Sequence, residues 1–355
     1  MNLSTLTEIT TTKLADNSVT VAKLASDVDT LIAGKQATIS GGATTILTSN
    51  LGAGKVLISD ANGKVGVSTN VTSAELEFVN GVTSNIQTQL NTLGVADYPV
   101  DILVIAGGGA GGGYHHSGGG GAGGMLAMRE KVASAQAYSV LVGAGGAGNN
   151  STDRSGALGG TSSFTGGYVR IYAQGGGGGG SYNSWGLNDG TDGGSGGGSS
   201  GYNIYRNSVG TAGQGNAGGR GGQYGGGGGG GAGGVGATGT SPNGGAGGVG
   251  LAWLDGMVRA GGGGGGTHNV SGGAGGAGGG GKGADVNGSP VAGTANTGGG
   301  GGGVYNSASA SSACNGGSGI VIIRYLGATR GSGGTITSSG GYTYHTFLNS
   351  GTFTA

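Results

Sequence analysis

Short apolar runs alternate with long glycine stretches over most of the chain. Three junctions have the same order, in which a β-prone apolar run passes directly into consecutive glycines: Val100–Gly109, Gly166–Gly180 and Leu251–Gly266. Extended β dihedrals and polyproline II dihedrals are neighbours in φ/ψ space, so a strand can continue into a glycine helix of polyproline II type without a turn. The pattern therefore predicts strands that continue as glycine helices.

Within the glycine stretches, the other residues often recur at every third position. Ala217, Arg220 and Gln223 follow this spacing, and so do Ala246 and Val249. Three residues make one turn of a polyproline II helix, so these side chains line one edge and leave two glycine edges bare. Bare edges let neighbouring helices exchange backbone hydrogen bonds, and each bond contributes a net ~0.5–1.5 kcal/mol to stability. These bonds offset the cost of ordering the glycines, which is ~0.5–1 kcal/mol for each glycine. We expect a packed bundle of polyglycine II helices.

Residues 1–97 are poor in glycine and have a different pattern. A short unit occurs twice with a period of ten residues, at 12–20 and 22–30, and has too few apolar residues to bury a core without partner chains. Two apolar runs, 55–59 and 64–68, flank an Asn-Gly sequence and predict a β-hairpin. A heptad pattern then predicts a short coiled coil, or alternatively one amphipathic helix packed on its own domain. Its a and d positions are Leu76, Val79, Ile86, Leu90 and Leu93.

Composition narrows the class of protein. The chain has 101 glycines but only 3 prolines in 355 residues, and no strict Gly-X-Y period, which excludes collagen. The regularly spaced apolar runs and a charged fraction of 8% favour order over low-complexity disorder. Equal numbers of acidic and basic residues, 15 each, leave no electrostatic signature for nucleic acid or anionic lipid. The single cysteine, Cys314, permits no intrachain disulfide.

The sequence shows no segment for export or membrane insertion. No apolar run approaches eighteen residues, and the first seven residues lack the basic and apolar regions of a signal peptide. We therefore expect the product to be made in the cytoplasm of the producing cell, to leave it by assembly or lysis, and not to insert into a membrane.

No catalytic or cofactor site is expected. Many Gly-x-Gly-x-x-Gly matches occur, but glycine follows where a nucleotide site needs a helix and a closing acidic residue. His115, His116 and His268 could bind a metal, yet adjacent histidines on an extended chain point to different sides, and no cysteine or carboxylate cluster accompanies them. No Ser-His-Asp or paired-carboxylate pattern is present. The sequence predicts neither an enzyme nor a metal or cofactor.

Aromatic and polar residues interrupt the glycine stretches at several places. Large side chains do not fit between bare glycine edges, so these residues are expected to project as loops at the ends of the bundle. Their composition suits recognition of a receptor, including stacking on saccharides; the alternative is that they plug the bundle ends and pack on one another. The candidate receptor-binding residues are Tyr114, His115, His116, Tyr182, Asn183, Trp185, Tyr202, Tyr205, Arg206, His268 and Tyr305.

Residues 8–95 resemble the shafts of bacteriophage tail fibres. The resemblance rests on the repeated Thr-Lys-Leu-Ala-Asp and Ala-Lys-Leu-Ala-Ser units, the Ser73–Thr83 segment and the Asn85–Leu90 segment that follows, in this order. Members of that family are homotrimers that hold an adhesive tip away from the virion. The resemblance implies a homotrimer, with other virion tail or baseplate proteins as partners.

The second part resembles glycine-rich tail-fibre and tip domains of phages. An opening strand at Val100–Gly109 and a closing strand at Gly317–Tyr325 bracket the glycine region, and runs at 138–146 and 162–164 fit the same pattern. The distal adhesins of T-even-like phages contain polyglycine II bundles of similar style. The terminal segment 341–355 departs from the pattern, because such a hairpin more often precedes the opening strand. It either completes its own domain or caps the fibre.

Together these observations predict a mainly β, elongated trimeric fibre with a short coiled coil and a β-sandwich-like domain that carries a polyglycine II bundle. The expected domains are a repetitive shaft at 1–97, a glycine-rich β/polyglycine II domain at 98–330 and a C-terminal β-hairpin at 331–355. The resemblance implies a virion fibre whose glycine-rich domain binds a bacterial surface polysaccharide or outer-membrane protein. The alternative is a purely structural fibre or assembly subunit.

Overall fold

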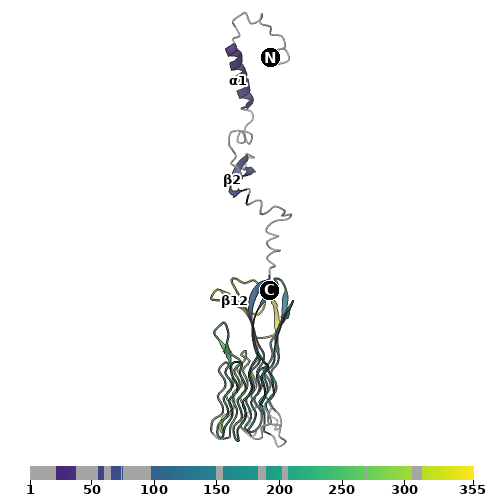
Figure 1. The fold of residues 1–355 in the computed structure, drawn as a ribbon, viewed down its shortest axis with the longest axis vertical. Coiled ribbons are helices and arrows are strands. Elements are labelled where there is room, and N and C mark those ends of the chain that lie inside the picture. Colours follow the sequence, from purple (N-terminus) through teal and green to yellow (C-terminus); the bar gives the residue numbers. More distant parts are fainter. Residues whose placement is uncertain are drawn as a thin grey trace. The chain divides into compact units, whose positions relative to one another are not determined.

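A computed structural model describes residues 21–36, 55–59, 65–72, 74, 97–148, 155–182, 189–201, 207–268, 270–305 and 314–355. The chain divides into two compact units, Met1–Leu90 and Asn91–Ala355 (Figure 1). The described residues are mainly β, with strands in four sheets and one regular helix.

The first unit contains helix α1 (Val21–Gln36) and a hairpin of strands β1 (Lys55–Ser59) and β2 (Val65–Thr72). The hairpin is confirmed, since β1 pairs antiparallel with β2 and Leu57 lies opposite Val67. Helix α1 was not expected; it covers the second repeat unit, at 22–30, which contains the good helix formers Ala, Lys and Leu. The heptad segment expected to form a coiled coil lies outside the described residues.

The second unit contains two antiparallel sheets that face each other across a common core. The first has the strand order β11-β12-β10-β3-β4, and the second has the order β13-β5-β6-β7. Their strands are β3 (Tyr98–Ile105), β4 (Met125–Val132), β5 (Ala137–Leu141), β6 (Ser162–Gly166), β7 (Val169–Ala173), β10 (Ile320–Leu326), β11 (Thr335–Ser339), β12 (Tyr342–Phe347) and β13 (Gly351–Thr354).

The inner faces of both sheets are apolar because alternate residues of each strand point to the same side. Ile102 and Val104 of β3 meet Phe164 of β6 in this core, and all are fully buried. The Phe164 ring stacks on Tyr138 of β5 with centroids 5.1 Å apart. This core holds the sheets in the arrangement from which the glycine segments emerge.

The end of β3 is buried on its other face as well. Leu103 and Ile105 pack there against Trp253, which lies between the short strands β8 (Leu251–Ala252) and β9 (Val258–Arg259). The run at 251–260, expected to be a strand that continues into glycine, is instead this hairpin, and that expectation was wrong. The reversal uses Gly256, whose φ of 77° is in the left-handed region that favours glycine.

The C-terminal segment contributes to both sheets. Strands β11 and β12 form a hairpin, and β12 pairs with β10 in the first sheet. The hairpin expected within residues 341–355 is not formed, because β12 and β13 belong to different sheets. The last strand, β13, pairs instead with β5 in the second sheet. Residues 335–354 therefore complete the sandwich of this unit. This is the first of the two alternatives from the sequence, that the terminal segment completes its own domain.

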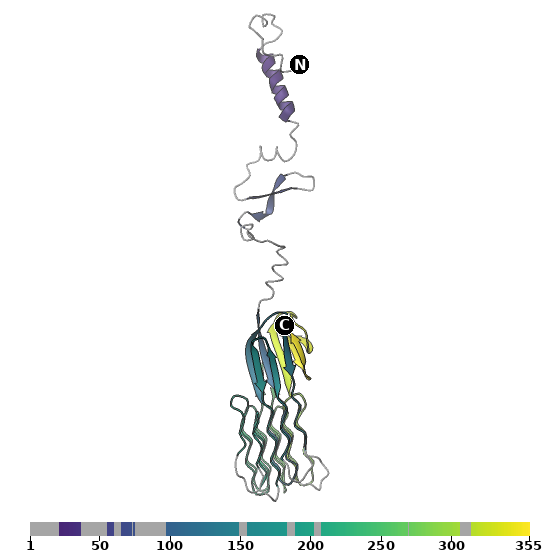
Figure 2. The same cartoon turned by 90° about the vertical axis from the view of Figure 1, so that its right-hand side faces the viewer.

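Strand β3 passes directly into residues 106–112, which turn at 113–117 and return as 118–124 to β4. Along 106–112, every third amide donates to the same neighbouring segment: Ala106 to Gly124, Gly109 to Gly121 and Gly112 to Gly118. The two intervening sets of amides donate to segments around Ala157 and Gly317. This three-residue repeat is that of a polyproline II helix, so the expected period is confirmed. Figure 2 shows such segments side by side, continuing the strands.

Inner and outer segments of this bundle differ in sequence for a steric reason. A Cβ atom on Gly263 of an inner segment would lie under 3.0 Å from the carbonyl oxygen of Gly301, closer than real Cβ contacts. Outer segments carry a side chain at every third position, and Arg220, Gln223 and Val249 point to solvent. Backbone packing therefore requires glycine on the faces that meet other segments.

Candidate functional site

Seven aromatic and imidazole rings gather at the end of the glycine bundle away from the sheets. We call this group the ring cluster; it comprises Tyr114, His115, His116, Tyr182, Tyr224, His268 and Tyr305. Each residue lies in a turn or directly after a glycine segment. The hydrogen-bond pattern brings these ends together, because Gly266 donates to Ser117, Val304 donates to Gly112, and Gly118 donates to Gly180.

His116 is at the centre of the ring cluster. Its ring centroid lies 5.3 Å from that of His268, 5.9 Å from that of Tyr224 and 6.3 Å from that of Tyr305. The ring of Tyr305 also meets His268 edge to face, with centroids 5.1 Å apart. Edge-to-face geometry is a favourable arrangement for aromatic pairs. His116 is 6% exposed, so its ring is packed rather than displayed.

His115 joins the cluster to two tyrosines. Its ring centroid lies 4.2 Å from that of Tyr114 and 6.5 Å from that of Tyr182. The amide of Tyr182 donates to the carbonyl of Tyr114 at 3.3 Å, which links these two chain segments. This side of the cluster is half-buried.

The turn at 113–117 places both adjacent histidines in one cluster. His115 and His116 have φ values of 24° and 42°, so the chain is not extended there, and their ring centroids are 5.8 Å apart. The expectation that they point to different sides was wrong for this reason. The Ser117 hydroxyl donates to the Tyr114 carbonyl at 2.8 Å and stabilises the turn.

Burial and the neighbouring imidazoles keep His115 and His116 uncharged. Burial, followed by the charges of the nearby His115 and His268, lowers the pKa of His116 to about 4. Burial, followed by the charge of His268, also lowers the pKa of His115. At neutral pH these imidazoles are therefore neutral rings that can both donate and accept hydrogen bonds. Among the described residues, no group of three or more His, Cys, Asp and Glu side chains could hold a metal ion.

The ring cluster also presents a surface. His268 is exposed, and Tyr114, Tyr224 and Tyr305 are partly exposed around the buried His116. Rings that pack on one another lose little conformational freedom when they contact a ligand. The arrangement can therefore offer several fixed faces for stacking and several polar atoms for hydrogen bonds.

The structure brings together six of the candidate residues chosen from the sequence: Tyr114, His115, His116, Tyr182, His268 and Tyr305. Sequence reasoning missed Tyr224, although it interrupts a glycine stretch in the same way as the others. The remaining candidates, Asn183, Trp185, Tyr202, Tyr205 and Arg206, lie outside the described residues.

Among the residues that the structure describes, no helix is long and apolar enough to cross a membrane.

Comparison with known proteins identifies one family. The family model described as the glycine-rich domain matches residues 83–326. No curated protein matches the chain, and no solved structure does. The matched range begins before β3 and includes the glycine bundle, the β8–β9 hairpin and the first six strands of the sandwich, from β3 to β10. The chain belongs to the glycine-rich domain family.

Proposed function

We propose that this protein is a bacteriophage tail fibre protein whose glycine-rich domain binds a bacterial surface receptor during adsorption. The ring cluster carries this proposal. It places aromatic and imidazole side chains at the end of a bundle held by backbone hydrogen bonds. A rigid support lowers the ordering cost of binding, which is ~0.5–1.5 kcal/mol for each mobile side chain.

The direction of the chain suits this role. It enters the sandwich at Tyr98, and β3 runs from there toward the bundle. Residues 106–112 then extend for about 20 Å at ~3.1 Å per residue before the turn that carries Tyr114. Within this unit, the start of β3 and the ring cluster are therefore at opposite ends, as expected for a tip that contacts a surface.

The chemistry of the ring cluster favours an uncharged or weakly charged receptor. His115 and His116 are neutral at pH 7 because burial lowers the pKa of each, and the tyrosines supply both flat faces and hydroxyl groups. We propose as receptor a bacterial surface polysaccharide or an outer-membrane protein. Several copies of a modest site raise the avidity of a particle by roughly 10²–10⁴ without new contacts.

A homotrimer is the proposed assembly, with other tail or baseplate proteins as partners in the virion. Helix α1 supports association because Val28, Leu31 and Ile32 lie on one side of it and are 47%, 56% and 56% exposed. An apolar stripe of this kind is stable in water when partner helices cover it.

The alternative function is that of a purely structural fibre or assembly subunit. The burial of His116 favours it in part, because rings that pack on one another also close the end of the bundle. In a receptor-binding fibre the exposed rings of the cluster contact the receptor, whereas in a structural fibre they only close the end of the bundle.

Adsorption to host cells distinguishes these functions. The variant Tyr114→Ala/His268→Ala/Tyr305→Ala removes exposed rings but keeps the buried His116. We expect it to reduce adsorption of purified protein or of virions by at least about tenfold, since few interface residues carry most binding energy. Tyr168→Ala is the matched control, because Tyr168 is a fully exposed tyrosine in the β6–β7 turn. Normal adsorption by the triple variant, with an unchanged melting temperature, would favour the structural function.

A further inference from the structure

The loop between β10 and β11 joins the two sheets of the sandwich. We call residues 327–334 the edge loop, because β11 and β13, the strands next to it, are edge strands of the two sheets. The loop is bonded to the second sheet, since the amide of Ser332 donates to the Thr354 carbonyl at 2.8 Å and the amide of Thr354 donates to the Ser332 carbonyl at 3.0 Å. It is also bonded to the first sheet, where the Thr343 hydroxyl donates to the Gly327 carbonyl at 2.7 Å. Opening of the edge loop would therefore free one sheet edge from the other.

His345 of β12 lies against this loop and is fully buried. Its ring meets Phe353 of β13 edge to face, with centroids 4.9 Å apart. Its Nδ1 atom lies 2.8 Å from the carbonyl oxygen of Gly333 in the edge loop. A carbonyl oxygen only accepts hydrogen bonds, so Nδ1 carries the proton of the neutral ring. The other nitrogen, Nε2, is then an acceptor.

The Tyr325 hydroxyl of β10 connects this acceptor to the edge loop. Its oxygen accepts from the amides of Arg330 and Gly331 at 3.0 and 3.3 Å and lies 2.9 Å from Nε2 of His345. The two amides face the lone pairs of the phenol oxygen, so its proton points to Nε2. The neutral imidazole therefore holds the edge loop twice, directly at Gly333 and through Tyr325.

A second proton on the His345 ring is incompatible with this arrangement. Nε2 would become a donor and face another donor, the Tyr325 hydroxyl, across 2.9 Å. The phenol oxygen can accept from the charged ring only by giving up an amide of the edge loop. The ionisable groups on the elements packed around His345 are Tyr325, Tyr98 of β3, Tyr138 of β5 and Arg330. The Arg330 guanidinium lies over the Tyr98 ring, 5.4 Å from its centroid, and its positive charge opposes a second one nearby.

The direction of the pH dependence follows from burial. Burial lowers the pKa of His345, whereas the hydrogen bond to the Gly333 carbonyl acts in the opposite direction. A histidine released into water regains its ordinary pKa of about 6.5. Opening of the edge loop therefore takes up a proton below about pH 6.5. The closed loop is stable above this pH and loses stability as the pH falls.

We propose that His345 and Tyr325 form a proton-sensitive latch, which holds the edge loop closed at neutral pH and releases it in acid. Release of the loop also removes the hydrogen bonds that tie β13 to it, so the two sheets lose their connection at this edge. The proposal does not depend on receptor binding by the ring cluster.

Hydrogen exchange of the full chain, followed by mass spectrometry, tests the latch. The amides of Arg330, Gly331 and Ser332 report on the edge loop, because each is hydrogen-bonded when the loop is closed. Exchange rates at pH 5 and pH 7.5 are each divided by the rate of an unstructured peptide at the same pH. Uptake of one proton favours opening by up to about thirtyfold at pH 5 relative to pH 7.5. We expect the protection of these amides to fall at least about threefold at pH 5, while β6 keeps its protection.

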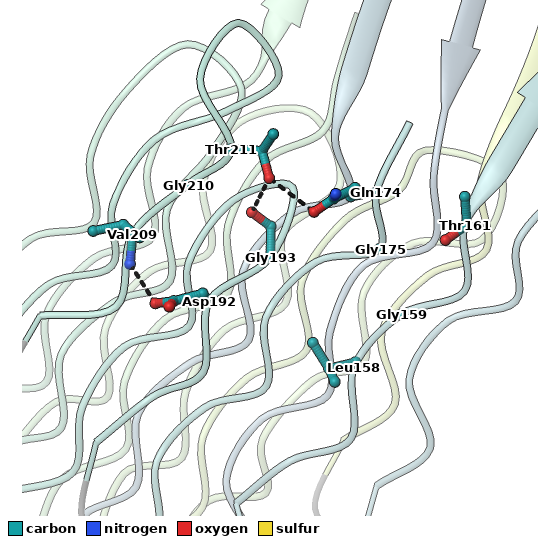
Figure 3. A pocket seen from close by; sticks show the side chains of 10 residues that line it. All are labelled: Leu158, Gly159, Thr161, Gln174, Gly175, Asp192, Gly193, Val209, Gly210 and Thr211. Atoms are coloured by element: carbon teal, nitrogen blue, oxygen red, sulfur yellow. Dashed lines mark hydrogen bonds between the residues drawn. The ribbon is translucent and has the colours of Figure 1, made fainter. Parts of the chain in front are cut away.

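Three variants assign the pH dependence to the latch. His345→Gln removes the titrating group, so protection of the edge loop should no longer depend on pH. Tyr325→Phe keeps the ring but removes the hydroxyl, so exchange of the loop should already be at least about threefold faster at pH 7.5. Thr211→Val is the matched control and should leave the loop unchanged. It removes a hydroxyl that lies 3.0 Å from both the Gln174 Oε1 atom and the Gly193 carbonyl oxygen, in a groove on the flank of the same unit (Figure 3).

His116→Phe separates the latch from the ring cluster, because it removes the other buried histidine and should leave the pH dependence of the edge loop in place. The latch is overturned if the loop of the original chain keeps its protection at pH 5. It is also overturned if β6 loses protection to the same extent, since the whole sandwich would then open. Persistence of the pH dependence in His345→Gln, or its loss in His116→Phe, overturns it as well. If His345→Gln does not fold, the original chain and Tyr325→Phe decide the outcome.

Discussion

A single methyl group inside the glycine bundle should destabilise the protein strongly. Gly262 is buried; its amide donates to Gly248 at 2.8 Å, and its carbonyl accepts from Gly276 at 2.8 Å. A Cβ atom there would lie 2.7 Å from the carbonyl oxygen of Gly230 and closer still to that of Gly229. These atoms belong to backbone, so Gly262→Ala must displace a neighbouring segment.

The magnitude follows from the hydrogen bonds of that neighbour. Gly229 donates to Gly263 at 2.8 Å and accepts from Gly248 at 2.9 Å, both in the interior. Losing two buried hydrogen bonds costs ~2–6 kcal/mol, at ~1–3 kcal/mol for each unsatisfied group. Overpacking strain adds ~1–3 kcal/mol. Reduced freedom of the unfolded chain offsets only ~0.4–1 kcal/mol, so the net loss is about 2–9 kcal/mol.

Thermal unfolding followed by circular dichroism measures this loss. At roughly 2–4 °C for each kcal/mol, Gly262→Ala should lower the melting temperature by about 4 °C or more. Gly234→Ala is the matched control, because its Cβ would meet only Val249, at 3.3 Å from Cγ2 and 3.6 Å from the amide nitrogen. Its melting temperature should change by no more than about 2 °C. Equal melting temperatures for the two variants would refute close backbone packing as the reason for glycine.

Two further predictions concern acid sensitivity and assembly. Burial holds the pKa of His116 at about 4 and that of His115 below 6.5, so the unfolded chain binds more protons between these pH values. Stability should therefore fall as the pH drops from 6.5 toward 4. In this window, His116→Phe should make the melting temperature less dependent on pH. A steeper dependence in the variant would contradict the assignment of the acid sensitivity to His116. The full chain should sediment as a trimer, and Leu31→Glu/Ile32→Glu should shift it toward lower mass because charges replace exposed apolar side chains of α1. A monomeric original chain would contradict the proposed assembly.

Local sequence patterns predicted much of the glycine-rich unit. The junction at Val100–Gly109 is a strand that continues into glycine, and the three-residue spacing around Arg220 places side chains on an outer edge. Both features depend on neighbouring residues along the chain, so the sequence shows them directly. The same local reasoning placed large aromatic residues at segment ends rather than between segments.

Features that depend on distant contacts were not predictable in this way. Strand β4 was not foreseen, because its sequence, MLAMREKV, lacks clear alternation and it lies at an edge of its sheet. The hairpin at Leu251–Arg259 has the composition of a strand, but Trp253 is needed to cover Leu103 and Ile105. Burial on a second face is a property of the assembled sheet and leaves no local signal.

The sequence by itself therefore determined strands such as β3, the three-residue period of the glycine segments and the residues that interrupt them. Tertiary structure decided which of these meet. His116 contacts His268 and Tyr305 only because the order of segments in the bundle joins three distant parts of the chain. Likewise, β13 pairs with β5 across more than two hundred residues. Glycine edges are nearly identical in sequence, so partner choice among segments is set by how the whole bundle satisfies its backbone hydrogen bonds.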